Sequence, residues 1–340
     1  MMIYVVIGSN SFTGSWMVDE LLANPENLII GISRSPEKGE FYLPYKTHQL
    51  DSKFLFHQCH IVREFERLMK IIDDFQPDFI INYAAETEVY QSHLTPVEYF
   101  ETNTLGVVQL CNELKGRSYL KRYIHISSAE IYGPCNSPVR ESTSPYPTTP
   151  YAVSKLAADL YLLASFKHDH FPAIIIRSTN VYGKHQQIYK IIPRSVIRLI
   201  RGEQIELHNG GTFIRPFIHV RDACRGVLAA IERGGIGEVY NFTAECNLTI
   251  FEVVRLICQK MGCDFEASTV SVEERTDHDR CYMLDDSKAR GHLDWRPQVP
   301  LEDGLDEVIA WIKGNWEAVQ TEPLIYQHKE QKTKHTDICR

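Results

Sequence analysis

The stretch IYVVIGSNSFTG, residues 3–14, joins a short apolar run to a glycine-flanked turn that leads into helical spacing. Such a turn lets backbone N–H groups approach a pyrophosphate at the N-terminus of a helix, so it predicts a dinucleotide site. The turn has the pattern GxxSxxG, with the small residue Ser11 where a middle glycine is typical. The residues that we expect to bind the cofactor here are Gly8, Ser11, Phe12, Thr13 and Gly14.

Apolar runs and helical spacing alternate through the first half of the chain. The runs at 3–7, 28–32, 78–82, 122–126 and 173–176 are separated by helical patterns at 16–22, 61–75, 99–114 and 151–166. Continuous apolar strands between helices predict a doubly wound parallel Rossmann sheet of the α/β class, with ligands at the carboxyl ends of the strands. We expect an NAD(P)-binding domain at 1–177 with a return to the sheet within 216–243, a smaller C-terminal substrate-binding lobe at 178–320, and a loose polar tail at 321–340.

Composition excludes several classes of function. The 340 residues carry a formal net charge of −8, which argues against general binding of nucleic acid or anionic membranes. No apolar run approaches the ~20 residues of a membrane span, and the start lacks the pattern of a signal peptide. The nine cysteines include no CxxC pair and the 14 histidines no HExxH motif, so we expect no metal and reduced thiols in a cytoplasmic protein.

The second apolar run ends in Ser33 and Arg34. A carboxylate at this place would bind the ribose 2′-hydroxyl of NAD, whereas an arginine can accommodate the 2′-phosphate of NADP. We therefore expect NADP or NAD, with a slight preference for NADP, although an arginine in a solvated loop would look the same in the sequence.

Tyr151 and Lys155 lie four residues apart on an expected helix and hence on one face of it. A tyrosine that removes a proton from a substrate hydroxyl needs a lower pKa than its usual ~10, and a nearby ammonium would favour the phenolate. Ser128 follows an expected strand end, where its hydroxyl could hold the substrate oxygen. These three side chains predict oxidation of an alcohol by a nicotinamide cofactor.

Several further motifs occur in order along nearly the whole chain. They include SSAEIYG at 127–133, YAVSK at 151–155, NYAAET at 82–87, ETN at 101–103, RSTNVYG at 177–183, RPFIHVRD at 215–222 and LEDGL at 301–305. With these motifs the chain resembles the extended short-chain dehydrogenases, and among them most closely the nucleotide-sugar 4,6-dehydratases of the dTDP-glucose type.

The resemblance implies a role for each matching residue. Ser128, Tyr151 and Lys155 would oxidise the sugar at C4, Glu130 would remove the C5 proton, and Ala84 would contact the cofactor. The residues that it assigns to the nucleotide-diphosphate sugar are Thr87, Asn180, Arg215, Arg275 and Asp279. It also implies nucleotide contacts near Tyr189, Lys190 and His208, and a homodimer formed through the helices at 99–114 and 151–166.

Two departures from the family pattern leave alternatives open. Ala129 stands where the dehydratases carry the aspartate that protonates the departing 6-hydroxyl, and Tyr90 stands where they carry another aspartate. Our first hypothesis is a 4,6-dehydratase, an NAD(P)-dependent hydro-lyase. A nucleotide-sugar 4-epimerase suits Ala129 but makes no use of Glu130. A UDP-uronate decarboxylase or a 5,6-dehydratase would use that glutamate, and a non-catalytic NADP-binding regulator would leave Tyr151 and Lys155 unexplained.

Overall fold

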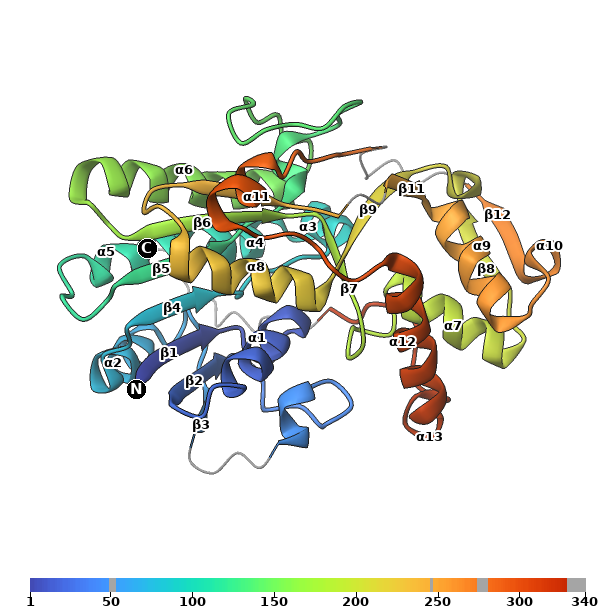
Figure 1. Cartoon of the computed structure of the whole chain (residues 1–340), viewed down its shortest axis with the longest axis horizontal. Coiled ribbons are helices and arrows are strands. Elements are labelled where there is room, and N and C mark those ends of the chain that lie inside the picture. The colour runs from blue at the N-terminus through green and yellow to red at the C-terminus, as the bar shows by residue number, and fades with distance from the viewer. Residues whose placement is uncertain (49–52, 245–246, 274–280, 329–340) are drawn as a thin grey trace, which may run out of the picture.

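Seven parallel strands form the central sheet of the computed structural model, which describes residues 1–48, 53–244, 247–273 and 281–328 (Figure 1). In chain order the strands are β1 (Met2–Ile7), β2 (Asn27–Ser33), β3 (Phe54–Gln58), β4 (Phe79–Asn82), β5 (Arg122–Ile126), β6 (Ala173–Ser178) and β10 (Val239–Phe242). Their order across the sheet is β10-β6-β5-β4-β1-β2-β3, which confirms the doubly wound Rossmann fold. The order reverses between β1 and β4, and ligands bind at such a switch point.

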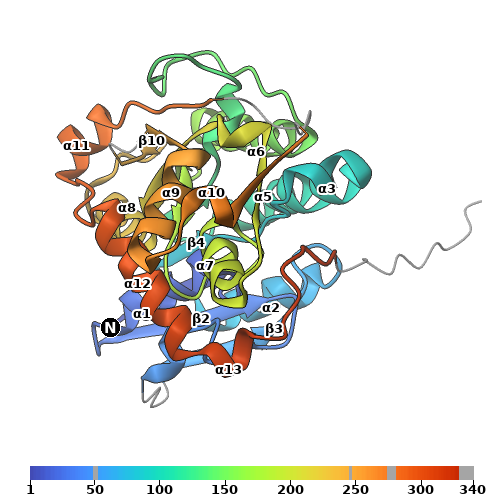
Figure 2. The same cartoon turned by 90° about the vertical axis from the view of Figure 1, so that its right-hand side faces the viewer.

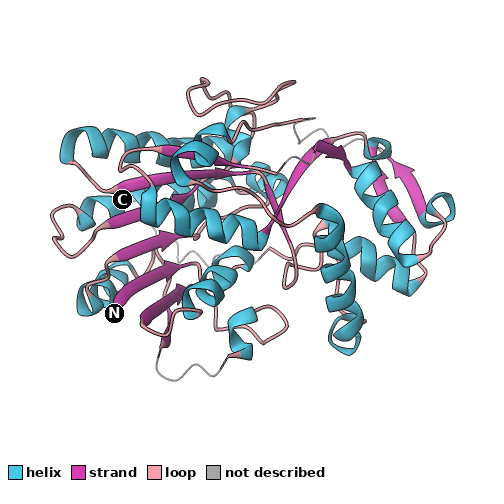
Figure 3. Cartoon of the chain, viewed as in Figure 1, coloured by secondary structure: helices cyan, strands magenta, loops and turns pink. Residues whose placement is uncertain are grey.

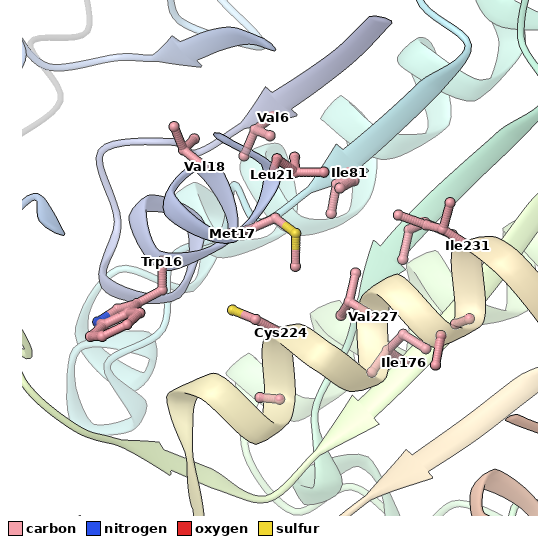
Figure 4. Packing of buried hydrophobic residues seen from close by; sticks show 14 of the residues in the cluster. Val6, Trp16, Met17, Val18, Leu21, Ile81, Ile176, Cys224, Val227 and Ile231 are labelled. Atoms are coloured by element: carbon pink, nitrogen blue, oxygen red, sulfur yellow. The ribbon is translucent and has the colours of Figure 1, made fainter. Parts of the chain in front are cut away.

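Helices cover both faces of this sheet (Figure 3). One face carries α1 (Phe12–Leu22), α8 (Val220–Arg233) and α11 (Ser287–Leu293), and the other carries α2 (Phe65–Phe75), α5 (Gly106–Leu114) and α6 (Pro150–Asp169). Along β1, Val6 packs into the first layer and Val5 into the second, because successive strand side chains point to opposite faces. Figure 4 shows Met17 of α1 close to Val227 of α8 above this sheet.

A smaller group of elements lies beyond the carboxyl ends of the central strands (Figures 1 and 2). A three-stranded sheet contains β7 (Asn180–Tyr182), β9 (Ile214–His219) and β11 (Asn247–Thr249), and β8 (Ile205–His208) pairs with β12 (Thr269–Val272). Their helices are α7 (Ile191–Arg201), α9 (Ile250–Met261), α10 (Phe265–Ser268), α12 (Leu301–Gly314) and α13 (Trp316–Val319). A hydrophobic cluster that includes Val196, Ile257 and Ile312 joins α7, α9 and α12.

Short helical turns occupy several of the connections. They are η1 (Pro44–Thr47), α3 (Val89–Leu94), η3 (Ala129–Tyr132) and η4 (Asn209–Gly211). The helix expected at 99–114 is interrupted: α4 (Pro96–Phe100) continues through a π-helical turn, η2 (Glu101–Leu105), into α5. Strand β3 was not predicted, because its residues FLFHQ are only partly apolar and form the edge of the sheet.

The first part of the segment 321–340, for which the sequence predicts a loose polar tail, packs against the protein in the structure. Leu324 is 9% exposed and belongs to the cluster that contains α7 and α12. Arg201 donates hydrogen bonds to the carbonyls of Val319 and Glu322 at 3.1 and 3.0 Å, and His328 lies 2.9 Å from Glu98. One apolar anchor and these polar contacts hold 321–328 against the protein, whereas 329–340 lie outside the described residues.

Within the described ranges, no helix has both the length and the apolar character needed to cross a lipid bilayer. In the same ranges, no three His, Cys, Asp or Glu side chains gather in an arrangement that could hold a metal ion.

Candidate active site

The glycine-flanked turn between β1 and α1 is tight enough to require glycine at both ends. Gly8 has φ +87°, and a Cβ on Gly14 would lie 2.2 Å from the Gly8 carbonyl oxygen. Ser11 caps α1, because its Oγ accepts a hydrogen bond from the Gly14 N–H at 3.1 Å. The first turn of a helix has N–H groups without intrahelical partners, and phosphate oxygens bind there, so the turn fits a dinucleotide pyrophosphate. Phe12 and Thr13 lie in that first turn.

The expected ribose contacts at the end of β2 have partners within the chain. The Ser33 Oγ accepts a hydrogen bond from the Asn10 N–H at 2.9 Å. The Arg34 guanidinium pairs with the Glu86 carboxylate, whose side chain is only 4% exposed. Because Glu86 already neutralises Arg34, a 2′-phosphate would compete with a buried carboxylate for the guanidinium. Ala84 closes the other side of the turn, since a Cβ on Gly8 would lie 2.8 Å from its nitrogen.

The candidate catalytic residues meet where β5 ends and α6 begins. Ser128 starts η3, and its Oγ accepts a hydrogen bond from the Glu130 N–H at 3.2 Å. Tyr151 lies in the first turn of α6, which is capped by Thr149. The Ser128 hydroxyl is close enough to lower the pKa of the Tyr151 phenol, and the charge of Glu130 raises that pKa. The structure therefore brings Ser128, Glu130 and Tyr151 together, as the sequence predicts.

Tyr151 and Lys155 are both buried, and burial shifts the pKa of each. Burial raises the pKa of Tyr151 and the charge of Glu130 raises it further, while the Ser128 contact opposes both. The Lys155 Nζ donates to the Ile126 carbonyl at 2.6 Å. Burial lowers the pKa of Lys155 to about 8, and the charge of Asp159 opposes that effect. The expectation that Lys155 lowers the Tyr151 pKa stays a prediction; in the structure the ammonium is desolvated and bound to a carbonyl.

A buried polar network lies behind Lys155, and the sequence analysis missed it. One turn along α6, Asp159 is fully buried and accepts from the Arg177 Nε at 3.0 Å. Arg177 also donates to the Tyr132 hydroxyl at 2.7 Å, which in turn donates to Asn241 at 3.0 Å. The network thereby joins α6 to the end of η3. Ser128 caps the start of η3, and Glu130 lies within it. The available signal was a charged Arg177 inside the apolar run of β6.

The expected sugar-nucleotide contacts are only partly described. The Tyr282 hydroxyl donates to Asn180 Oδ1 at 3.0 Å, and the Arg215 guanidinium lies 5.0 Å from the centroid of the same ring. Thr87 is exposed in the connection after β4. Arg275 and Asp279 lie outside the described residues.

The three residues that were expected to contact the nucleotide do not lie together in the structure. Tyr189 and Lys190 precede α7 and both contact Glu88, another residue that the sequence analysis missed. His208 ends β8, and its Nδ1 lies 3.0 Å from the carbonyl oxygen of Glu273. A charged residue after the AAET stretch was the only available signal for Glu88.

The chain is similar to known proteins over most of its length. The model of the NAD dependent epimerase/dehydratase family matches residues 4–242. The dTDP-glucose 4,6-dehydratase of Actinoplanes sp. is 34% identical over 240 residues, which cover 70% of this chain and 74% of that protein. The crystal structure of the dTDP-glucose 4,6-dehydratase DesIV from Streptomyces venezuelae with NAD bound has a TM-score of 0.86 at 29% identity, covering 93% of this chain and 98% of that one. For the UDP-glucose 4-epimerase of Thermotoga maritima the TM-score is 0.84 at 27% identity, with 93% and 100% covered.

Proposed function

Because this chain belongs to the NAD dependent epimerase/dehydratase family, we infer from its dehydratase relatives and its site that it is a nucleotide-sugar 4,6-dehydratase, a hydro-lyase. The observation that carries this function is the position of Glu130 beside Tyr151. Elimination of water needs a base for the C5 proton in addition to the base that oxidises C4. Ser128 and Tyr151 alone would suffice for oxidation, so Glu130 is what an elimination adds.

Each residue then acts at a stated atom. A nicotinamide cofactor held at this site would supply hydride transfer from C4 and back to C6, so no external oxidant would be consumed. Ser128 holds the C4 oxygen while the Tyr151 phenol oxygen receives its proton. The ketone at C4 makes the C5 proton acidic, and Glu130 removes it and later returns a proton to C5. Lys155, held against the Ile126 carbonyl, keeps a positive charge beside the cofactor site.

The function is tested by the fate of the C5 proton. In D₂O the wild-type protein should convert a sugar nucleotide to a product that has lost water and carries deuterium at C5. Glu130→Gln keeps the shape but removes the base, so turnover should fall by about 10²–10⁴-fold while C4 oxidation still reduces the cofactor. Tyr151→Phe is the matched control, because it should lose cofactor reduction as well. A wild-type product of unchanged mass without C5 deuterium would refute the dehydratase function.

The 4-epimerase is the second candidate, and Ala129 favours it. Ala129 is 1% exposed and packs with Tyr282, so this position offers no acid for a departing hydroxyl. An epimerase oxidises and reduces C4 without breaking the C5–H bond. The same D₂O experiment therefore separates the two functions.

We propose NAD as the working cofactor. The pair between Arg34 and Glu86 supports it, as does the NAD bound to the solved dehydratase. The slight preference for NADP that Arg34 suggested stays a prediction. Titration of both cofactors into cofactor-free protein tests it directly.

We propose that the two parts of the chain bind different ligands. Residues 1–177 would hold the cofactor and residues 178–320 the nucleotide-diphosphate sugar, with Asn180 and Arg215 facing its phosphates. Arginine forks bind phosphate oxygens through two parallel hydrogen bonds, which suits Arg215 to this role. Because the relatives named above include dTDP-glucose enzymes, dTDP-glucose is the first substrate to test, followed by UDP-glucose.

We further propose a homodimer. Large apolar side chains are exposed on neighbouring elements: Leu94 on α3, Val97 on α4, Leu105 on η2 and Leu160 on α6. Burying such a face against a second copy would remove apolar surface from water. Sedimentation should give a dimer for the wild-type protein and a monomer for Leu160→Glu. A wild-type monomer at micromolar concentration would exclude this assembly.

A further inference from the structure

The elimination leaves one chemical requirement unassigned. Hydroxide is a poor leaving group, so a group must protonate the departing C6 oxygen as its bond to carbon breaks. Ala129 is a buried methyl group in the site motif, and Glu130 is occupied with the C5 proton. Another acid must therefore reach the sugar from a different element.

Glu88 is a carboxylate beside the catalytic tyrosine that the reaction above does not use. It precedes α3, and its carbonyl accepts a hydrogen bond from the Tyr99 hydroxyl at 2.6 Å. The Tyr99 ring meets the Tyr151 ring edge-on at 6.4 Å between centroids, and Val89 packs against both. The charge of Glu88 raises the pKa of Tyr151, as the charge of Glu130 does more strongly. Through Val89 and Tyr99, Glu88 is joined to the surroundings of Tyr151 from a different element than Glu130.

Two side chains of the segment before α7, Tyr189 and Lys190, contact the Glu88 carboxylate and can hold a proton next to it. The Lys190 ammonium pairs with Glu88 Oε1, and the Tyr189 hydroxyl donates to the same oxygen at 3.1 Å. The Lys190 side chain is 35% exposed and that of Glu88 20%, so a proton lost from the pair can be replaced from water. This arrangement joins the residue before α3 to the segment that leads into α7.

We propose that Glu88, together with Lys190, delivers the proton that the departing C6 hydroxyl needs, a role that rests on the proposed dehydratase function. The Lys190 ammonium passes a proton through the Glu88 carboxyl to the C6 oxygen. The C6–O bond breaks with its electron pair on oxygen and water leaves. Tyr151 releases to solvent the proton that it took from the C4 hydroxyl, and the pair takes one proton from solvent, so protons balance over the turnover.

The phenols of Tyr189 and Tyr282 are less suited to donating a proton to the departing C6 oxygen. Burial and the Glu88 charge raise the pKa of Tyr189, which makes its phenol a reluctant proton donor. The Tyr282 hydroxyl already donates a hydrogen bond to Asn180 Oδ1, with 3.0 Å between the two oxygens.

The decisive variant is Glu88→Gln, which keeps the shape and the contact with Tyr189 but cannot pass on a proton. Product formation from the natural sugar nucleotide should fall by about 10²-fold or more, as is typical of losing a general acid. Because Tyr151 and Glu130 remain, the starting sugar recovered from D₂O should carry deuterium at C5. A 6-deoxy-6-fluoro sugar nucleotide should restore elimination to near the wild-type rate, because fluoride leaves without needing the acid.

Lys190→Met is the second variant and carries the test if Glu88→Gln does not fold. It should show the same loss and the same rescue by fluoride. Lys260→Met is the control, since it removes another lysine that is paired with a carboxylate, Asp306, and lies on α9 away from the pocket. Its activity should equal that of the wild type.

The outcomes separate this proposal from the proposed function. If the wild-type protein removes water from no sugar nucleotide, the dehydratase function fails. If the wild type does so but both variants keep their rate, the acid lies elsewhere and the present proposal is overturned. Loss of C5 exchange in Glu88→Gln, or no rescue by the fluoro analogue, would also overturn it, because the residue would then serve an earlier step.

Discussion

Asp159→Asn tests whether the buried network behind Lys155 stabilises the fold. The substitution keeps the volume of the side chain but removes its charge, which leaves the 3%-exposed Arg177 guanidinium and the Lys155 ammonium without their shared carboxylate. Breaking a buried ion pair by removing one partner costs about 3–5 kcal/mol. Burial already raises the pKa of Asp159, so its ionised form is itself costly and the lower end of that range applies.

A loss of about 3 kcal/mol in the free energy of unfolding can be converted into a change in Tm. An unfolding entropy of about 2 cal/mol/K per residue over 340 residues gives a fall in Tm of about 4 °C. Scanning calorimetry and urea titration at pH 7 measure the two quantities. Asp74→Asn is the control, because the 2.9 Å pair of Asp74 with Lys70 is exposed on α2 and should contribute less than about 0.5 kcal/mol.

The same variant has an effect that a purely structural role would not produce. The Asp159 charge favours the protonated form of Lys155. Asp159→Asn should therefore lower the Lys155 pKa and move the alkaline limb of the activity profile to lower pH, and Asp159→Glu should restore it. If Asp159→Asn costs no more stability than Asp74→Asn and leaves the profile unmoved, the reasoning about this network is wrong.

Three further predictions concern single side chains. Tyr151→Phe should abolish turnover and leave cofactor affinity near normal, because only the hydroxyl is lost; activity within a few-fold of wild type would remove Tyr151 from the reaction. For Lys155 the folded pKa of about 8 lies below the ordinary value of 10.5, so between these values the unfolded chain holds a proton that the folded chain has released, and stability rises with pH. Lys155→Met should therefore stabilise the cofactor-free protein at pH 7 and lose that advantage by about pH 10 in urea titrations; a pH-independent difference would contradict the assigned pKa. Arg34→Gln should leave the ratio of NADP to NAD affinities unchanged in calorimetric titrations, because Glu86 already holds the guanidinium; a selective loss of NADP affinity would show that Arg34 binds the 2′-phosphate.

The amino-acid sequence alone determined the features that depend on neighbouring residues. Apolar runs that alternate with helical spacing predict a parallel sheet covered on both faces, since strand and helix periods are local properties. The spacing of Tyr151 and Lys155 placed both on one face of α6, and Gly8, Ser11 and Gly14 marked the tight turn. The family resemblance then joined Ser128 and Glu130 to them as a site.

Only the tertiary structure decided which charged groups meet across the chain. Arg177 lies 18 residues from Asp159, Arg34 lies 52 from Glu86, and Lys190 lies 102 from Glu88. No periodicity relates such partners, because their contact depends on how elements that are distant in the sequence pack together. The charge state of Lys155 and the position of Glu88 beside Tyr151 follow from that packing. For this reason the sequence could suggest a missing acid at Ala129 but could not indicate which residue replaces it.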